Sequence, residues 1–414
     1  MKLIRPFNAL RPRPELAARV AAPPYDVLNR EEALEMASGN EFSFLRVNKP
    51  EIDVAPDIDA YDPRVYQRGA QNLQRFIEQG ILQRDDTPCF YVYRQVMGAH
   101  SQVGLVAVAS VAAYEQDLIK KHEFTRPDKE DDRVNHINTL SAQVGPVFLT
   151  YRARPEIDAL MAQVQAQAPV YDFVAQDGNR HVFWVVSDTG MIDSIQRAFD
   201  SVDCLYVADG HHRSAAAQRV KELRKAANPA HTGEEAYNWF SSVIFPHNQM
   251  QILDYNRVLK DLNGLSEQEF LQKIQACFNV RESKAGAIKP AHAHQFTLYL
   301  GGRWYVLDVI EGLWNPDDPV ASLDVAILQQ NLLLPVLGIA DQRRDKRIDF
   351  VGGIRGLQAL EKRVDSGQWQ LAIALYPTSI QSLMAVADAG EVMPPKSTWF
   401  EPKLKSGLFV HVLD

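Results

Sequence analysis

Cysteine is scarce in this chain of 414 residues. The three cysteines, Cys89, Cys204 and Cys277, are far apart and form no CxxC pair. This scarcity excludes a disulfide-stapled scaffold, a zinc ribbon and a thioredoxin-like redox motif. We expect the three thiols to be reduced and to pack as small hydrophobic side chains.

The chain also lacks a stretch that could enter a membrane. Its most apolar segment, residues 325–340, is interrupted by glutamine, asparagine and proline. A transmembrane helix needs about 20 mostly apolar residues. Residues 1–14 carry arginines and prolines in place of the apolar core of a signal peptide. We therefore expect a cytoplasmic protein without a membrane partner.

Positive charge is not in excess, because 44 Lys and Arg stand against 52 Asp and Glu, a net charge of −8. Such a chain is a poor candidate for binding a duplex through phosphate neutralisation, so we expect no nucleic-acid partner. The P-loop, GxGxxG after a strand, GxSxG and HExxH are all missing. Their absence removes the common signatures of nucleotide, dinucleotide, hydrolase and zinc-protease sites.

What the chain does contain is an average globular composition, with 46% hydrophobic and 23% charged residues. Strand and helix patterns interleave: hairpins are predicted at residues 89–112 and 295–309, and helices at residues 66–80 and 379–388. The predicted fold class is mixed α/β, that is α+β. A break near residue 247 predicts two domains, 1–247 and 248–414.

The strongest chemical motif is Ala208-Asp209-Gly210-His211-His212-Arg213-Ser214, between an apolar strand and a predicted helix. A helix N-terminus exposes unpaired N–H groups and the positive end of the helix dipole, so it binds phosphate readily. Gly210 permits close backbone approach, Arg213 offers a fork for phosphate oxygens, and Asp209 is a candidate magnesium ligand. Simple helix capping by Asp209, with solvent-facing histidines, is an equally weighted alternative.

A second candidate is the charged stretch from Lys120 to Arg133. Such a run is usually a solvated surface, and we give that interpretation equal weight. The alternative is an anionic-ligand site, in which Glu123 accepts a proton while Arg126 or Lys129 binds a carboxylate or phosphate. The proline-rich tail from Met393 to Lys403 is predicted to be an ordered loop packed on the body of the protein.

Short segments spread along the chain resemble a known family. In order they are Arg5-Pro6-Phe7, residues 22–27 (APPYDV), 44–47 (FLRV), 122–125 (HEFT), 209–213 (DGHHR), 255–257 (YNR) and 394–398 (PPKST). This set resembles the domain-of-unknown-function 1015 family over essentially the full length of the chain. Such a resemblance is specific for membership, and it implies no activity by itself.

The Asp-Gly-His-His-Arg turn is similar, more distantly, to the phosphate-binding turn of the ParB and sulfiredoxin superfamily. That superfamily includes ParB-like kinases that phosphorylate free L-serine with ATP or ADP. The resemblance implies a ParB/sulfiredoxin-like nucleotide-binding core with insertions in residues 1–247, and a further α/β domain of unknown role in residues 248–414. Sulfiredoxin chemistry itself is not expected, since His211 stands after Gly210 where that enzyme has its catalytic cysteine.

The same resemblance implies roles for individual residues. Glu123 becomes the candidate catalytic base, and Asp209 becomes a catalytic residue and the Mg²⁺ ligand. The ATP or ADP phosphates are expected at the turn, on Gly210, His211, His212 and Arg213. The substrate is expected near the charged stretch, at His122, Thr125, Arg126 and Lys129.

These observations predict a small-molecule kinase that transfers phosphate from ATP or ADP to the hydroxyl of free L-serine or a similar metabolite. Two alternatives stay open, a ParB-like nucleotide-binding switch that binds a partner and a phosphate-ester hydrolase that uses water. No basic helix-turn-helix of the kind that ParB proteins carry is present. The kinase prediction requires Glu123 and Asp209 to meet at one site.

Overall fold

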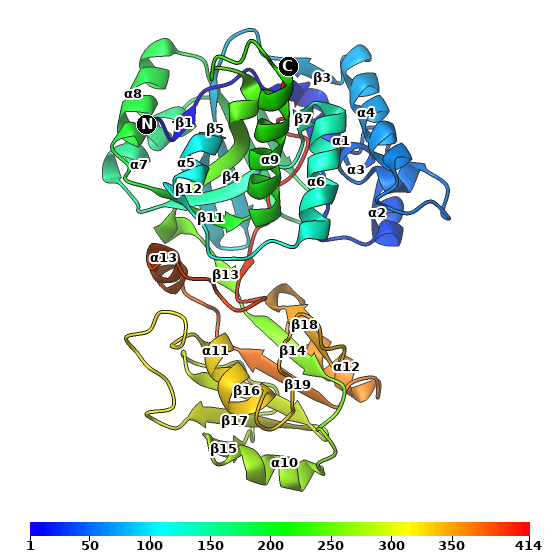
Figure 1. Cartoon of the computed structure of the whole chain (residues 1–414), viewed down its shortest axis with the longest axis vertical. Coiled ribbons are helices and arrows are strands. Elements are labelled where there is room, and N and C mark those ends of the chain that lie inside the picture. Colours follow the sequence, from blue (N-terminus) through cyan, green and yellow to red (C-terminus); the bar gives the residue numbers. More distant parts are fainter. The chain divides into compact units, whose positions relative to one another are not determined.

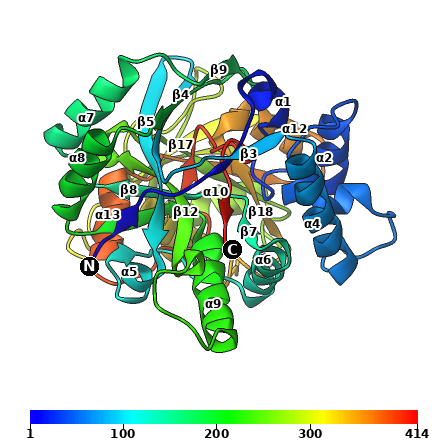
Figure 2. The ribbon, with the colours of Figure 1, turned by 90° about the horizontal axis from the view of Figure 1, so that it is seen from above.

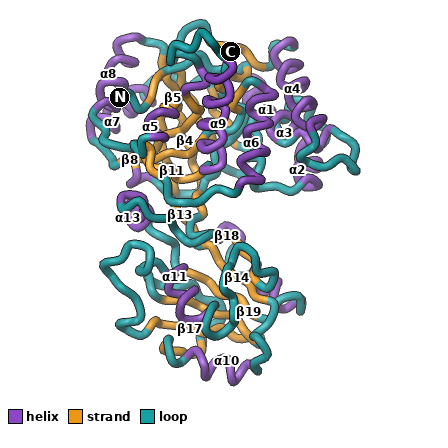
Figure 3. Tube along the Cα trace, viewed as in Figure 1, coloured by secondary structure: helices purple, strands orange, loops and turns teal.

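The computed structural model describes all residues, 1–414. They divide into two compact units: unit 1 comprises residues 1–250 and 402–414, and unit 2 comprises residues 251–401. Helices and strands interleave in both units (Figures 1 and 3), which confirms the mixed α/β class. None of the helices has the length and apolar content needed to cross a bilayer.

Unit 1 is built around a nine-stranded sheet. Along the sheet the strands are β6 (Ile119–Lys120), β11 (Leu205–Asp209), β8 (Val147–Tyr151), β12 (Trp239–Pro246), β5 (His100–Ser110), β4 (Phe90–Met97), β10 (Arg180–Val186) and β9 (Tyr171–Val174), with β1 (Ile4–Arg5) beside β5. The pairs β6–β11 and β8–β12 are parallel, and the other neighbours are antiparallel. The predicted hairpin of residues 89–112 forms β4 and β5, in which Met97 pairs with His100.

Helices pack on this sheet through a large apolar cluster. The helices of unit 1 are α1 (Ala17–Val20), α2 (Arg30–Ala37), α3 (Leu45–Asn48), α4 (Pro63–Glu78), α5 (Val111–Glu115), α6 (Pro127–Leu140), α7 (Pro155–Gln165), α8 (Thr189–Asp200) and α9 (His211–Ala227). Val92 and Leu105 of the sheet share one cluster with Met161 of α7 and Phe199 of α8. The helices α6 and α9 lie side by side (Figures 1 and 2) and share a smaller cluster.

The last residues of the chain belong to unit 1 because they pack against the sheet. Strand side chains alternate between the two faces, so Phe183 points away from the α7–α8 cluster. There its ring stacks on Phe409 with the centroids 5.9 Å apart. Gln95 Nε2 donates to the carbonyl of Lys403 at 2.9 Å. Short strand pairs complete the unit, namely β7 (Ala142–Gln143) with β21 (His411–Val412) and β2 (Leu10–Pro12) with β3 (Leu82–Arg84).

Unit 2 has its own six-stranded sheet, which is antiparallel throughout. Its order is β15 (Phe278–Glu282), β17 (Arg303–Val309), β16 (Gln295–Leu300), β19 (Leu371–Leu375), β14 (Tyr255–Leu259) and β18 (Ile348–Gly352). The pair β13 (Ile252–Leu253) with β20 (Trp399–Phe400) and the helices α10 (Glu267–Ile274), α11 (Asp324–Leu328), α12 (Gln358–Asp365) and α13 (Ile380–Asp388) complete it. The predicted second hairpin is present as β16 and β17.

Candidate functional site

The predicted phosphate turn lies where β11 passes into α9. The pairing of β11 with β8 shifts register between Val207 and Asp209, an irregularity that re-aims side chains at a strand end. Gly210 then adopts a left-handed conformation, with φ of 103°, and α9 begins at His211. No side chain caps this 17-residue helix, so Asp209 is not its cap and the backbone N–H groups of the first turn have no side-chain partner.

Gly210 is required at this turn for two reasons. Its φ disfavours any residue with a Cβ, and a Cβ there would lie 3.1 Å from the Cζ and Nε atoms of Arg213. The Arg213 guanidinium therefore folds back over the glycine. Its Nη1 donates to the Pro146 carbonyl, and its Nε has no hydrogen-bond partner although it is buried.

Asp209 lies between two cations. Its Oδ2 is 3.4 Å from Lys403 Nζ and 3.6 Å from Arg213 Nη2. Burial by itself would raise the pKa of Asp209, but Lys403 and Arg213 outweigh burial and hold it well below its usual value. Asp209 is therefore a fixed anion, and its Oδ2 is the oxygen that pairs with both cations. Sequence reasoning missed Lys403, which reaches this site because the C-terminal segment returns to unit 1.

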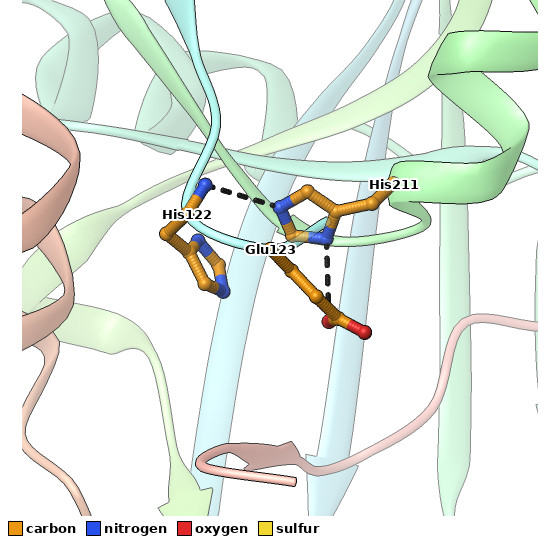
Figure 4. Close-up of side chains that lie close together, drawn as sticks. All are labelled: His122, Glu123 and His211. Atoms are coloured by element: carbon orange, nitrogen blue, oxygen red, sulfur yellow. Dashed lines mark hydrogen bonds and ion pairs between the residues drawn. The ribbon is translucent and has the colours of Figure 1, made fainter. Parts of the chain in front are cut away.

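The loop that carries Glu123 is held against the turn by both histidines. The backbone N–H of His122 donates to His211 Nε2 at 3.5 Å, and that of Arg126 donates to His212 Nε2 at 3.0 Å. These contacts lie on either side of Glu123 in the sequence. Glu123 Oε2 is 3.7 Å from His211 Nδ1, and Figure 4 shows the carboxylate beside the imidazole. The structure thus brings Glu123 and the Asp209 turn together.

Burial keeps these histidines neutral. It lowers the pKa of His122 to about 4 and lowers that of His212. Burial, with the adjacent His122, lowers the pKa of His211 well below its ordinary value. A neutral imidazole has one N–H. Because Nε2 of His211 accepts a hydrogen bond, the proton is on Nδ1 and faces Glu123.

Ligand atoms of His122, Glu123 and His211 lie within 4.8 Å of one another, which raises the question of a metal ion. The His211 tautomer does not fit one, since Nδ1 carries the proton and the Nε2 lone pair is engaged by the His122 N–H. A nitrogen-rich set is also a poor match for Mg²⁺, which takes oxygen ligands. The Asp209 carboxylate, by contrast, offers the oxygen atoms that Mg²⁺ prefers as ligands.

The sequence can now be compared with known proteins. A family model described as "Protein of unknown function (DUF1015)" matches residues 4–326. The chain belongs to this family. The expected membership is therefore confirmed. No curated protein matches the chain.

Several solved structures resemble this DUF1015 member, with low sequence identity and low TM-scores. A free serine kinase in complex with AMP has 13% sequence identity and a TM-score of 0.36, covering 73% of this chain and 91% of that one. A conserved hypothetical protein from Pyrococcus furiosus has 16% identity and a TM-score of 0.35, covering 73% and 95%. C-terminally truncated SbnI from Staphylococcus aureus has 14% identity and a TM-score of 0.32, covering 74% and 87%.

In this DUF1015 protein, the other residues predicted to bind substrate lie at the beginning of α6. Thr125 Oγ1 donates to Glu130. The exposed Arg126 side chain pairs with Asp128 at 2.9 Å, and Lys129 Nζ donates to the Tyr61 hydroxyl at 2.6 Å. These side chains contact α6 and its neighbours, whereas His122 packs edge-on against the His211 ring at 4.4 Å.

Proposed function

We propose that this DUF1015 member is a small-molecule kinase that transfers a phosphoryl group from ATP or ADP to the hydroxyl of free L-serine or a similar metabolite. One observation supports the proposal most. Glu123 and the Asp209-Gly210 turn, far apart in sequence, are joined through His211 beside an uncapped helix N-terminus. A proton acceptor and a phosphate-binding turn at one place are what phosphoryl transfer to a hydroxyl requires.

Each group has a distinct task in this proposal. Glu123, whose side chain is 48% exposed, is accessible to a substrate hydroxyl and accepts its proton. His211 Nδ1 lies 3.7 Å from that carboxylate and faces it. The N–H groups that begin α9 bind phosphate oxygens, and Arg213 and Lys403 add positive charge beside them.

Asp209 would hold Mg²⁺ through its carboxylate, since this ion takes oxygen ligands. When bound, the ion neutralises charge on the phosphates. Lys403 and Arg213 pair with Oδ2 of this carboxylate, so its orientation is fixed before any ligand binds.

Phosphorus NMR of the purified protein with ATP or ADP, Mg²⁺ and L-serine tests the proposal. We expect O-phosphoserine to accumulate while the nucleotide loses one phosphate. Release of inorganic phosphate without a phosphorylated acceptor would contradict the kinase and favour a hydrolase. Nucleotide binding without any turnover would contradict it too and favour a nucleotide-binding switch.

A further inference from the structure

The C-terminal segment of unit 1, residues 402–414, brings a cation to the phosphate turn. Within residues 401–410, Lys403 is the one residue that is not buried. Its side chain is 20% exposed, whereas that of Arg213, the other cation paired with Asp209, is 8% exposed. Of these two cations, Lys403 is therefore the one that a ligand at the turn can reach more easily.

A chain of buried amide groups holds the backbone of Lys403. Gln95 of β4 and Gln102 of β5 are direct cross-strand partners, and both side chains are completely buried. Gln102 Nε2 donates to Gln95 Oε1 at 3.0 Å, and Gln95 Nε2 donates to the Lys403 carbonyl at 2.9 Å. His100 Nε2 donates to Gln102 Oε1 at 3.2 Å and begins the chain.

Two buried glutamines on one sheet face need an explanation. Glutamine is mostly an exposed residue, and an amide that leaves water costs free energy unless it is hydrogen-bonded. Apolar side chains at both positions would avoid this cost. What the amide chain adds is a donor for one carbonyl outside the sheet, that of Lys403.

The residues after Lys403 are fixed as well. Lys405 Nζ lies 2.5 Å from Asp177 Oδ2, and its side chain is nearly buried. Ser406 and Ala22 exchange two backbone hydrogen bonds, at 2.8 and 3.0 Å. The backbone from which the Lys403 side chain extends is thus immobilised before any ligand binds, which lowers the entropy that a flexible lysine loses on binding.

We propose that Lys403 binds a phosphate oxygen of the nucleotide and that Gln95 and Gln102 are positioning residues, which act on the phosphate site through Lys403. An ammonium group has three donors, so it can pair with Asp209 and with a phosphate oxygen at once. The inference rests on the phosphate-binding part of the proposed function. It adds two residues of the sheet interior, for which the sequence gave no expectation.

Binding of ADP and of adenosine to the full chain, followed by ligand-observed NMR, tests the role of Lys403. Lys403→Met should raise the Kd for ADP by about 10- to 100-fold, the range for losing a hydrogen bond between charged groups. The Kd for adenosine, which has no phosphate, should stay within about twofold. An unchanged Kd for ADP would overturn the inference, and so would an equal loss for adenosine.

A double-mutant cycle tests the positioning residues. Gln95→Met keeps the length of the side chain but has no donor, and it should raise the Kd for ADP by about 2- to 10-fold. In the Lys403→Met background the same change should alter the Kd by less than about twofold, whereas its effect on the thermal midpoint should be the same in both backgrounds. The same fold-loss of ADP affinity in both backgrounds would overturn the positioning role.

Two further variants separate positioning from a general loss of stability. Gln102→Met leaves the Gln95–Lys403 hydrogen bond in place and should give a smaller loss of ADP affinity in the same direction. Ser242→Ala is the matched control, since the buried Ser242 Oγ donates to the Ala107 carbonyl at 3.0 Å within the same sheet. It should lower the thermal midpoint without changing ADP affinity. A loss of ADP affinity in Ser242→Ala equal to that in Gln95→Met would overturn the inference.

Failure of this inference differs from failure of the kinase proposal. ADP binding that Lys403→Met and Gln95→Met both weaken, in a parent protein that forms no phosphoserine, keeps the inference and removes the kinase. Phosphoserine formation with an unchanged Kd for ADP in both variants keeps the kinase and overturns the inference.

Discussion

Each unit buries an arginine, but the two arginines have opposite surroundings. Arg257 in unit 2 is completely buried, and its Nη2 donates to the carbonyls of Lys396 at 3.1 Å and Pro395 at 3.4 Å. Its Nη1 donates to the Tyr255 carbonyl. Arg213 in unit 1 donates to one carbonyl and keeps an unpaired Nε beside a pocket.

The contrast separates an arginine whose donors are used within the fold from one that we propose binds a ligand. Arg257 ties the beginning of the predicted ordered tail to β14. Burial, with no carboxylate beside it, lowers its pKa to about 10. For Arg213 burial would also lower the pKa, but Asp209 and Asp26 raise it. Carbonyl partners complete the first site, whereas the second keeps a full charge and one donor without a partner in the protein.

Acidification should produce the largest difference in stability between the two units. The buried histidines, His122, His136, His181, His211 and His411, all belong to unit 1. The folded pKa of His122, about 4, lies below its unfolded value of 6.5. The unfolded state therefore binds more protons between these values, so stability is complete above pH 6.5 and falls towards pH 4. His122 alone contributes on the order of 3 kcal/mol to this loss.

Unit 2 should respond in the opposite direction. Burial raises the pKa of Asp324 from 3.8 to about 7, so the folded state binds the extra proton between these values and stability rises as the pH falls. Hydrogen exchange of the full chain at about pH 7 and about pH 5, corrected for intrinsic rates, measures the amide protection of both units. Equal changes in protection of the two units would break the comparison.

Replacing Arg257 or Arg213 by leucine should give the next largest difference in stability between the two units. Arg257→Leu leaves several buried carbonyls without donors, at about 1–3 kcal/mol each, so unit 2 should lose about 3 kcal/mol or more. Arg213→Leu removes one carbonyl's donor and leaves Asp209 paired with Lys403, so the loss in unit 1 should be smaller. Urea titration read by hydrogen exchange in β14 and β11 measures both. A larger loss for Arg213→Leu would contradict the structural role given to Arg257.

The smallest effect concerns the turn over which Arg213 folds. Gly210→Ala forces a Cβ into the left-handed region, at a cost of about 1–2 kcal/mol, and pushes the Arg213 guanidinium aside. The control Gly80→Ala has a φ of +64° but nothing within 4 Å of its Cβ, so it reports strain alone. We expect both variants to lower the thermal midpoint, and only Gly210→Ala to weaken nucleotide binding. Equal nucleotide affinity in the two variants would remove the role of Arg213 at the turn.

Local patterns were sufficient to predict several of these elements. The β-branched runs around Gly98 and Gly301-Gly302 predict two hairpins, and both are present. The strand before Asp209 and the helix after Gly210 also follow from the sequence, because apolar residues end at a glycine that a left-handed turn requires.

Other features depend on tertiary contacts and could not be predicted from local sequence patterns. The charged stretch from Lys120 to Arg133 was as readily a solvated surface as a site, yet α6 begins at Pro127 and buries Asp132 and Arg133, which pair with each other. Pro127 followed by acidic residues is a helix-start signal that could have revealed this helix. Lys403 had no local signal, because only the return of the C-terminal segment to unit 1 brings it to Asp209.

The kinase account depends on Glu123 as the proton acceptor at the turn, and Glu123→Gln tests this most directly. Glutamine keeps the size of the side chain and an oxygen for the His211 N–H, but it cannot take a proton at neutral pH. In a single-turnover assay with ATP, Mg²⁺ and L-serine, the rate of phosphoserine formation should fall by about 10²–10⁴-fold. Nucleotide affinity should stay within about twofold of the parent, and Glu222→Gln, an exposed change on α9, should be fully active. A Glu123→Gln variant that forms phosphoserine at the parent rate would contradict the account.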